Sequence, residues 1–154
     1  MLKGIKQTDN DLLIVIQKYG CLFLCFANVS PLIFEGNSGR KALNKIWFEA
    51  EKKGYITGDL NKDGDYDDDG EAEIVNHNAL ANEFFALSVA YDNKHHGANE
   101  TIPASVAFVF GKYVYKYGHF VQIDKSKKVI FDSLGESNTV QNGKLESMRW
   151  YYAV

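Results

Sequence analysis

The spacing of apolar residues predicts helices in the first half of the chain. Residues 21–30 (CLFLCFANVS) combine apolar side chains at helical spacing with interleaved aromatics, which predicts a buried helix ending near Pro31. Residues 38–56 place apolar side chains at positions 42, 43, 46 and 47. They predict an amphipathic helix with Ser38 as N-cap and Gly54 as C-cap.

Two further segments complete the expected helical half. Residues 8–20 begin with good N-cap candidates and end in glycine, and they predict a short helix or strand. Residues 76–93 predict another amphipathic helix.

The second half changes to the pattern of β-strands. Residues 104–134 are rich in Val, Ile, Phe and Tyr with turn residues between the runs, and residues 147–154 predict a last strand. Helices followed by antiparallel strands predict an α+β fold, in which N-terminal helices pack on a C-terminal antiparallel sheet. The length of 154 residues is that of a single domain.

Composition excludes several classes of protein. Hydrophobic residues make up 45% and aromatic residues 14% of the chain, which is enough for a folded core. The net charge of −3 gives no indication of nucleic-acid binding. The N-terminus lacks the apolar segment of a signal peptide, and no apolar run is long enough to span a membrane, so we expect a cytoplasmic protein.

Cys21 and Cys25 are the candidate reactive side chains of the first half. If their segment is helical, a spacing of four puts both thiols on one face with side chains running in parallel, which is poor geometry for a disulfide. Cys21 follows Gly20 and would begin the helix, where the positive end of the helix dipole favours a thiolate. Cys25 lies one turn further in, between Leu24 and Phe26, and is expected in the core.

A hairpin in the second half predicts a partner for such a thiol. If the turn is centred between Lys125 and Ser126, Ile123 pairs with Lys128, Val121 with Ile130, and His119 with Asp132. Directly opposed residues share a face of the sheet, so this register places an imidazole beside a carboxylate. A three-residue loop would break the pairing.

The order of these residues resembles that of the papain-like cysteine peptidases. The matching segments are QKYGCLFLCFANV, YGHFVQID and VIFDS, which lie between about residue 17 and residue 135. Within that superfamily, the chain is most similar to the compact branch that processes bacteriocin leader peptides and to its uncharacterised bacterial relatives. The resemblance implies a Cys21 nucleophile, a His119 general base and acid, and an orienting Asp132. It also implies a peptide or protein substrate and an oxyanion hole formed by the Gln17 side chain and the Cys21 backbone N–H.

Two features depart from the pattern of that superfamily and keep an alternative function open. Gln17 precedes Cys21 by four residues, where the family has five or six, and the small residues after the nucleophile are replaced by Leu22 and Phe23. A bulky helix start would suit a catalytically silent papain-like module that binds a peptide or protein partner in the same cleft. Both cysteine and histidine are also common as purely structural residues.

The acidic stretch DLNKDGDYDDDGE carries a partial calcium-loop pattern. Between Asp59 and Glu73 the net charge is −7, so the rest of the chain carries +4. Asp59, Asn61 and Asp63 occupy ligand positions 1, 3 and 5, Gly64 occupies position 6, the Asp65 carbonyl position 7, and Asp67 position 9. Position 12, normally a bidentate Glu, is Gly70. A structural Ca²⁺ ion and a solvated acidic loop are both compatible with this pattern, and no cofactor is expected for catalysis.

A third function follows if the acidic loop is the main feature of the chain. The protein would then be a calcium-organised interaction domain in which Cys21 and His119 are incidental.

Overall fold

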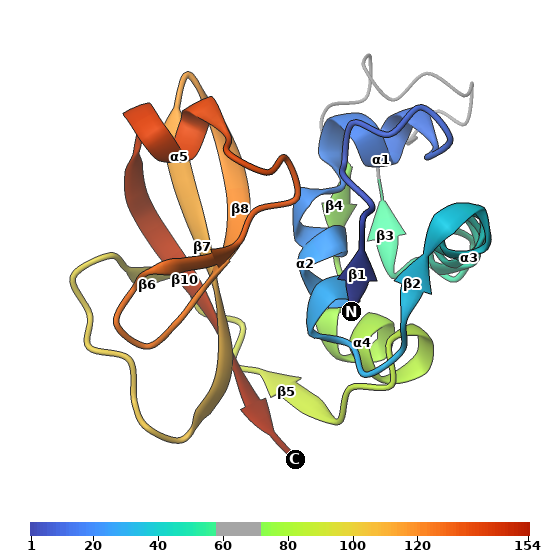
Figure 1. The fold of residues 1–154 in the computed structure, drawn as a ribbon. Helices are drawn as coiled ribbons and strands as arrows, with labels where there is room; N and C mark the ends of the chain where they lie inside the picture. Colours follow the sequence, from blue (N-terminus) through green and yellow to red (C-terminus); the bar gives the residue numbers. More distant parts are fainter. Residues whose placement is uncertain (58–71) are drawn as a thin grey trace. The chain divides into compact units, whose positions relative to one another are not determined.

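The computed structural model describes residues 1–57 and 72–154 of the chain. These residues form two compact units, Met1–Leu87 and Ser88–Val154. The first contains most of the helices and the second an antiparallel sheet (Figure 1), so the expected α+β architecture is confirmed. Within the described ranges, no helix has the length and apolar character needed to cross a membrane.

The first unit is mainly helical. Its four strands form two short two-stranded ladders, β1 with β2 and β3 with β4. Its elements are β1 (Leu2–Lys3), α1 (Ile14–Tyr19), α2 (Cys21–Val29), β2 (Phe34–Glu35), α3 (Gly36–Lys52), β3 (Ile56–Thr57), β4 (Glu73–Ile74) and α4 (His77–Phe84).

Helix α2 forms the centre of the first unit, as its apolar sequence predicts. Five consecutive side chains, from Phe23 to Ala27, are buried. The ring of Phe23 packs edge-on against Trp47 of α3 at 5.1 Å and against Phe85 at 5.4 Å. Fully buried aromatic rings of this kind each contribute about 2–3 kcal/mol to folding, so α2 is firmly anchored in its unit.

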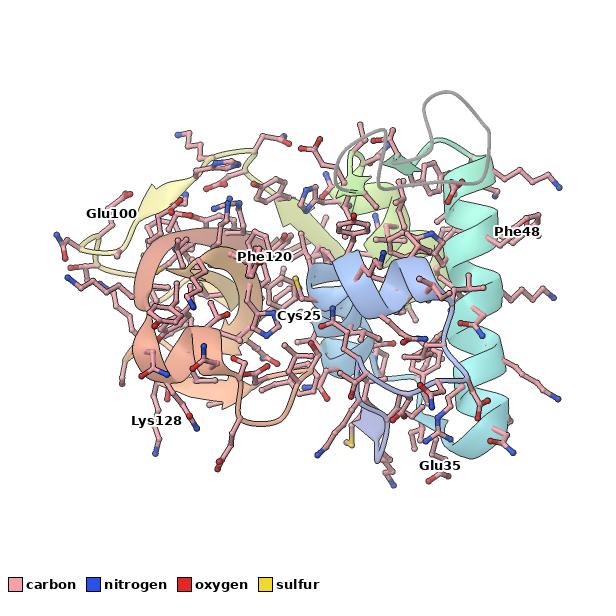
Figure 2. The ribbon with its side chains drawn as sticks, turned by 90° about the horizontal axis from the view of Figure 1, so that it is seen from above. Cys25, Glu35, Phe48, Glu100, Phe120 and Lys128 are labelled. Carbon is pink, nitrogen blue, oxygen red and sulfur yellow. The ribbon has the colours of Figure 1, made fainter. Side chains whose placement is uncertain are left out.

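Helix α3 begins earlier and ends as its sequence predicts. Its N-cap is Glu35, and Ser38 lies within the first turn, so the predicted start was wrong by one turn. At the other end, Gly54 has a φ of +78°, and Tyr55 N–H donates to the Ala50 carbonyl at 2.9 Å. This is the Schellman arrangement, in which glycine occupies the left-handed position at no steric cost. The exposed face of α3 carries Phe48, which projects away from the helix (Figure 2).

The helix predicted over residues 76–93 is only half as long as expected. Helix α4 starts as predicted, because the Asn76 side chain accepts a hydrogen bond from the Ala79 N–H at 3.0 Å. It ends at Phe84, and Ala86 follows with a φ of +53°. That left-handed residue stops the helix, and Val89–Tyr91 then forms a strand instead.

The second unit is one antiparallel sheet with strand order β5–β10–β7–β8–β9, and β6 also pairs with β10. Figure 1 shows β7, β8 and β10 as a strongly curved sheet with α5 at one end. The elements are β5 (Val89–Tyr91), β6 (His96–Gly97), β7 (Val106–Tyr115), β8 (Tyr117–Ile123), β9 (Val129–Phe131), α5 (Asn138–Asn142) and β10 (Lys144–Ala153).

The two faces of this sheet carry different side chains. One face buries an aliphatic cluster that includes Val109, Val121 and Met148. The other carries stacked aromatic rings such as Phe108 and Tyr151, whose centroids are 5.0 Å apart. Since successive residues of a strand point to opposite faces, His119 of β8 lies on the aliphatic face and Phe120 on the aromatic face.

The long connection between β5 and β7 is held to the sheet by His96. Its ring stacks on Trp150 with centroids 3.4 Å apart, and its two nitrogens lie 2.6 Å from an Asp92 oxygen and 3.1 Å from a Glu100 oxygen. The two carboxylates lie on opposite sides of the ring. The cluster therefore holds the connection against β10, and its members do not form a common set of metal ligands.

Candidate functional site

Cys21 is the first residue of α2 and follows the single-residue break after α1. Gly20, at the break, has an ordinary φ of −87°. A Cβ at this position would lie 2.4 Å from the Ile16 carbonyl oxygen. Glycine is therefore needed because its Cα lies directly against Ile16 of α1, and not because the backbone adopts a left-handed conformation.

The two thiols differ as the sequence predicts. Cys21 is partly exposed, whereas Cys25 is fully buried, and no disulfide joins them. The thiol of Cys21 lies at the N-terminal end of a nine-residue helix. Cys25 belongs to the core of the first unit.

Gln17, the candidate oxyanion residue, is held by bonds within its own unit. Its side-chain amide donates to the Leu12 carbonyl at 2.7 Å. The buried side chain of Gln7 donates in turn to the Gln17 carbonyl at 3.0 Å, and so satisfies one of the last carbonyls of α1. Hydrogen bonds therefore hold Gln17 through both its side chain and its backbone. The Leu12 carbonyl accepts one of the two N–H groups of its side-chain amide.

His119 and Asp132 are joined directly in the second unit. Nε2 of His119 lies 2.7 Å from Oδ1 of Asp132, and both side chains are almost completely buried. The Asp132 carboxylate accepts further hydrogen bonds from the backbone N–H groups of Leu134, at 3.0 Å, and Ser137, at 3.1 Å. Ser137 is itself fixed as the N-cap of α5.

These hydrogen bonds keep Asp132 ionised. Burial alone would raise the pKa of its carboxyl group, but the hydrogen bonds from His119, Ser137 and Leu134 outweigh that effect and lower the pKa to about 2. A carboxylate can only accept hydrogen bonds, so the proton of the short contact resides on Nε2 of His119. In the neutral ring, Nδ1 is then the nitrogen that carries the lone pair.

The predicted hairpin register is wrong, although the predicted pair of residues meets. Gln122 pairs with Phe131 and Ile123 with Val129, with a bulge between them. The turn is a three-residue loop in which Lys127 has a φ of +67° and Asp124 N–H donates to the Lys128 carbonyl. Asp132 lies one residue beyond β9, so its side chain is not restricted to one face by the strand and can reach His119.

The four candidate catalytic residues fall into two pairs. Gln17 and Cys21 belong to the first unit, and His119 and Asp132 to the second. The candidate calcium ligands Asp59, Asn61, Asp63, Asp65 and Asp67 lie outside the described residues. Among the described residues, no group of three or more His, Cys, Asp or Glu side chains is arranged to hold a metal ion.

Two residues that position the site were not predicted. Ser137 precedes a short polar helix. Serine is a common N-cap residue, so the sequence could have indicated this position. Gln7 lies in an irregular segment ten residues before its partner Gln17, and no local pattern indicates their contact.

Acid should weaken the second unit through Asp132. Its carboxyl pKa is lowered from 3.8 to about 2 on folding, so the ionised form contributes stability that is complete above pH 4. This contribution, about 2 kcal/mol, should be lost as the pH falls from about 4 to 2. Urea unfolding of wild type and of Asp132→Asn should therefore differ at pH 6 and converge at pH 2. A constant difference across this range would contradict the proposed ionisation.

Comparison with known proteins assigns the chain to a family. A family model described as "Protein of unknown function, DUF261" matches residues 1–153. No curated protein and no solved structure matches the chain. Because the family match extends over nearly the whole sequence, the protein belongs to DUF261, a family of proteins of unknown function.

Proposed function

We propose that this protein is a papain-like cysteine peptidase or amide hydrolase. The observation that carries the proposal is the buried hydrogen bond of 2.7 Å between Nε2 of His119 and the ionised Asp132. A histidine fixed in this tautomer is the base that a thiol nucleophile requires. Cys21, partly exposed at a helix N-terminus, is the thiol that we assign to it.

The reaction would proceed in two steps through a thioester. Nδ1 of His119 takes the proton of the Cys21 thiol, and the sulfur attacks the carbonyl carbon of the peptide bond. The imidazolium then gives its proton to the leaving amine as the carbon–nitrogen bond breaks. In the second step, water loses a proton to Nδ1 and attacks the thioester, which releases the acid and restores the thiol. Asp132 stabilises the imidazolium and holds its orientation throughout.

Gln17 is proposed as the oxyanion donor together with the Cys21 backbone N–H. The amide group has two N–H donors, and the bond to Leu12 occupies one of them. The second would be directed at the developing negative charge on the carbonyl oxygen of the substrate.

A silent peptide-binding module remains the second candidate function, and the residues after Cys21 decide how strongly it is favoured. Phe23 is buried against Trp47 and Phe85, so its bulk fills the core of the first unit and not a substrate cleft. Leu22 is the partly exposed residue next to the thiol. The argument for a silent module therefore depends on Leu22.

A peptide pool distinguishes the two functions. The purified protein is incubated with a proteome-derived peptide mixture, and new peptide termini are identified by mass spectrometry. A peptidase generates new termini that disappear in Cys21→Ala. A silent module generates none, but retains a subset of intact peptides after gel filtration, and this outcome would replace the peptidase proposal.

We also propose that the acidic segment binds a structural calcium ion. The ligand pattern of residues 59–67 supports this, and its flanks are held together because Thr57 of β3 pairs with Glu73 of β4. A cation would relieve the mutual repulsion of the acidic side chains.

Calcium should therefore raise the melting temperature. At a hundredfold excess over the dissociation constant, binding to the folded state adds about 2.7 kcal/mol, or about 5–10 °C for a chain of this size. Differential scanning calorimetry in calcium, magnesium and EDTA measures the shift, and magnesium should do less because it requires a tighter octahedral site. The double variant Asp59→Ala, Asp63→Ala is the control. A melting temperature that does not respond to calcium or EDTA would leave the segment as a solvated loop.

A further inference from the structure

Arg149 is a buried arginine without a counter-ion. It lies on β10, is 5% exposed, and its Cζ lies 5.2 Å from the centre of the Phe120 ring. Nη1 donates to Ser147 Oγ at 2.9 Å and to the Met148 carbonyl at 3.4 Å. Among the described residues, no carboxylate lies within ion-pair distance of the guanidinium group.

A buried guanidinium group without a carboxylate partner destabilises the fold unless a bound molecule supplies an anion. Burial lowers the pKa of Arg149, and the neighbouring Tyr91, Tyr151 and Glu146 side chains offset this effect only in part. Burying a charged group without an ion-pair partner destabilises the folded state. Selection for folding alone would favour an apolar residue at this position, so the guanidinium group indicates a binding function.

The unused nitrogens of Arg149 form a pair suited to a planar anion. In the described chain, Nε1 of Trp150 is the one buried side-chain nitrogen or oxygen that lacks a partner. Nε and Nη2 of Arg149 donate to no atom of this part of the chain, so both remain in contact with solvent. These two nitrogens carry parallel N–H bonds, which match the two oxygens of a carboxylate.

Two neighbouring rows of residues on this sheet face contain basic but no acidic side chains. Ser147 pairs with Lys112, and Lys112 pairs with Phe120, so these residues share the face of Arg149. The next row across the same strands consists of Arg149, Phe110 and Gln122.

Lys112 extends toward the neighbouring strand on this face. A Cβ at Gly118 would lie 2.7 Å from its Cε, so the absence of a side chain at Gly118 makes room for the lysine. Two cationic side chains therefore lie on either side of Phe120, with no acidic residue in either row.

We propose that Arg149, Phe120 and Lys112 form a carboxylate-binding site on the aromatic face of the sheet. Nε and Nη2 of Arg149 bind the two carboxylate oxygens, the Phe120 ring packs against the adjoining carbon atoms, and Lys112 adds a second positive charge. The apolar ring favours a carboxylate attached to a carbon chain, such as an acidic side chain of a peptide, over hydrated inorganic phosphate. This site consists of β7, β8 and β10 alone and does not depend on catalysis by Cys21.

The small number of arginines provides a direct test by NMR. The chain has two, Arg149 and Arg40, and Arg40 is already paired through its Nε with Asp9 at 3.0 Å. The ¹⁵N–¹H spectrum of the full-length protein should therefore show two arginine Nε–H signals. The variants Arg149→Lys and Arg40→Lys assign them.

The probe is N-acetyl-glutamic acid α-amide, and its neutral match is N-acetyl-glutamine α-amide. The acidic probe should shift the Arg149 signal saturably and leave that of Arg40 in place, and the neutral probe should bind about tenfold more weakly or worse. In Arg149→Lys, binding followed through the Phe120 backbone amide should also weaken about tenfold, because lysine keeps the charge but lacks the paired N–H groups.

Three outcomes would overturn the proposal. They are an Arg149 signal that does not move, an equal response to the acidic and neutral probes, and a response to inorganic phosphate alone. The wild-type titration is decisive even if Arg149→Lys fails to fold. Cys21→Ala should bind the probe as wild type does, so failure of the peptidase proposal and failure of this one are separate results.

Discussion

Replacing Cys21 with alanine should lower kcat for peptide hydrolysis by a factor of about 10⁴ or more, because it removes the proposed nucleophile. The control is Cys25→Ala. Cys25 is fully buried in the core of the first unit, so its replacement should cost about 1 kcal/mol of stability and leave kcat within a few-fold of wild type. Both variants are compared with wild type on the same cleaved peptide by initial rates.

The stability of the variants separates catalysis from folding. Cys21 is partly exposed, so Cys21→Ala should keep a melting temperature close to that of wild type. Hydrolysis that persists in Cys21→Ala, or that is lost equally in Cys25→Ala, would exclude Cys21 as the nucleophile.

The second large effect is expected at Asp132. Asp132→Ala removes the acceptor of the His119 Nε2 proton and leaves a buried donor unsatisfied, so kcat/KM should fall by a factor of about 10² to 10⁴. The matched variant is Asp132→Asn, whose amide oxygen can still accept that proton. It should retain activity within about tenfold of wild type while losing the acid-sensitive part of the stability.

These two variants distinguish orientation from charge. If the orientation of His119 is the main role of Asp132, then Asp132→Asn is active and Asp132→Ala is not. Equal loss in both variants would mean that the negative charge is essential, and equal retention would remove Asp132 from the site.

The pattern of apolar residues predicted the elements that bury the most side chains. Helix α2 and strands β7 and β10 were found because a buried helix and a strand with alternating faces leave clear periodic signals. Strand β5 was mistaken for helix because its three residues continue an apolar run, and the change depends on the left-handed Ala86. Alanine in that conformation gives no local signal, unlike Gly54 after α3.

The His119–Asp132 pair was found through a register that is itself wrong. Lys127 takes the left-handed position of the turn, where glycine or asparagine would have indicated a three-residue loop. The contact forms because Asp132 lies beyond the strand, and Ser137 and Leu134 hold its carboxylate in place. Contacts of this kind depend on tertiary structure, and sequence spacing alone does not determine them.

The rate of alkylation of Cys21 tests the central claim most directly. In the native protein between pH 5 and 9, iodoacetamide should modify Cys21 at least tenfold faster than Cys25, as followed by mass spectrometry of the two thiols in the digested chain. In His119→Ala, the rate at Cys21 should fall about tenfold or more at pH 6, because this variant lacks the imidazole to which the proposal assigns the Cys21 proton. An alkylation rate at Cys21 that is the same with and without His119 would contradict the pairing of the two residues, and with it the proposed peptidase site.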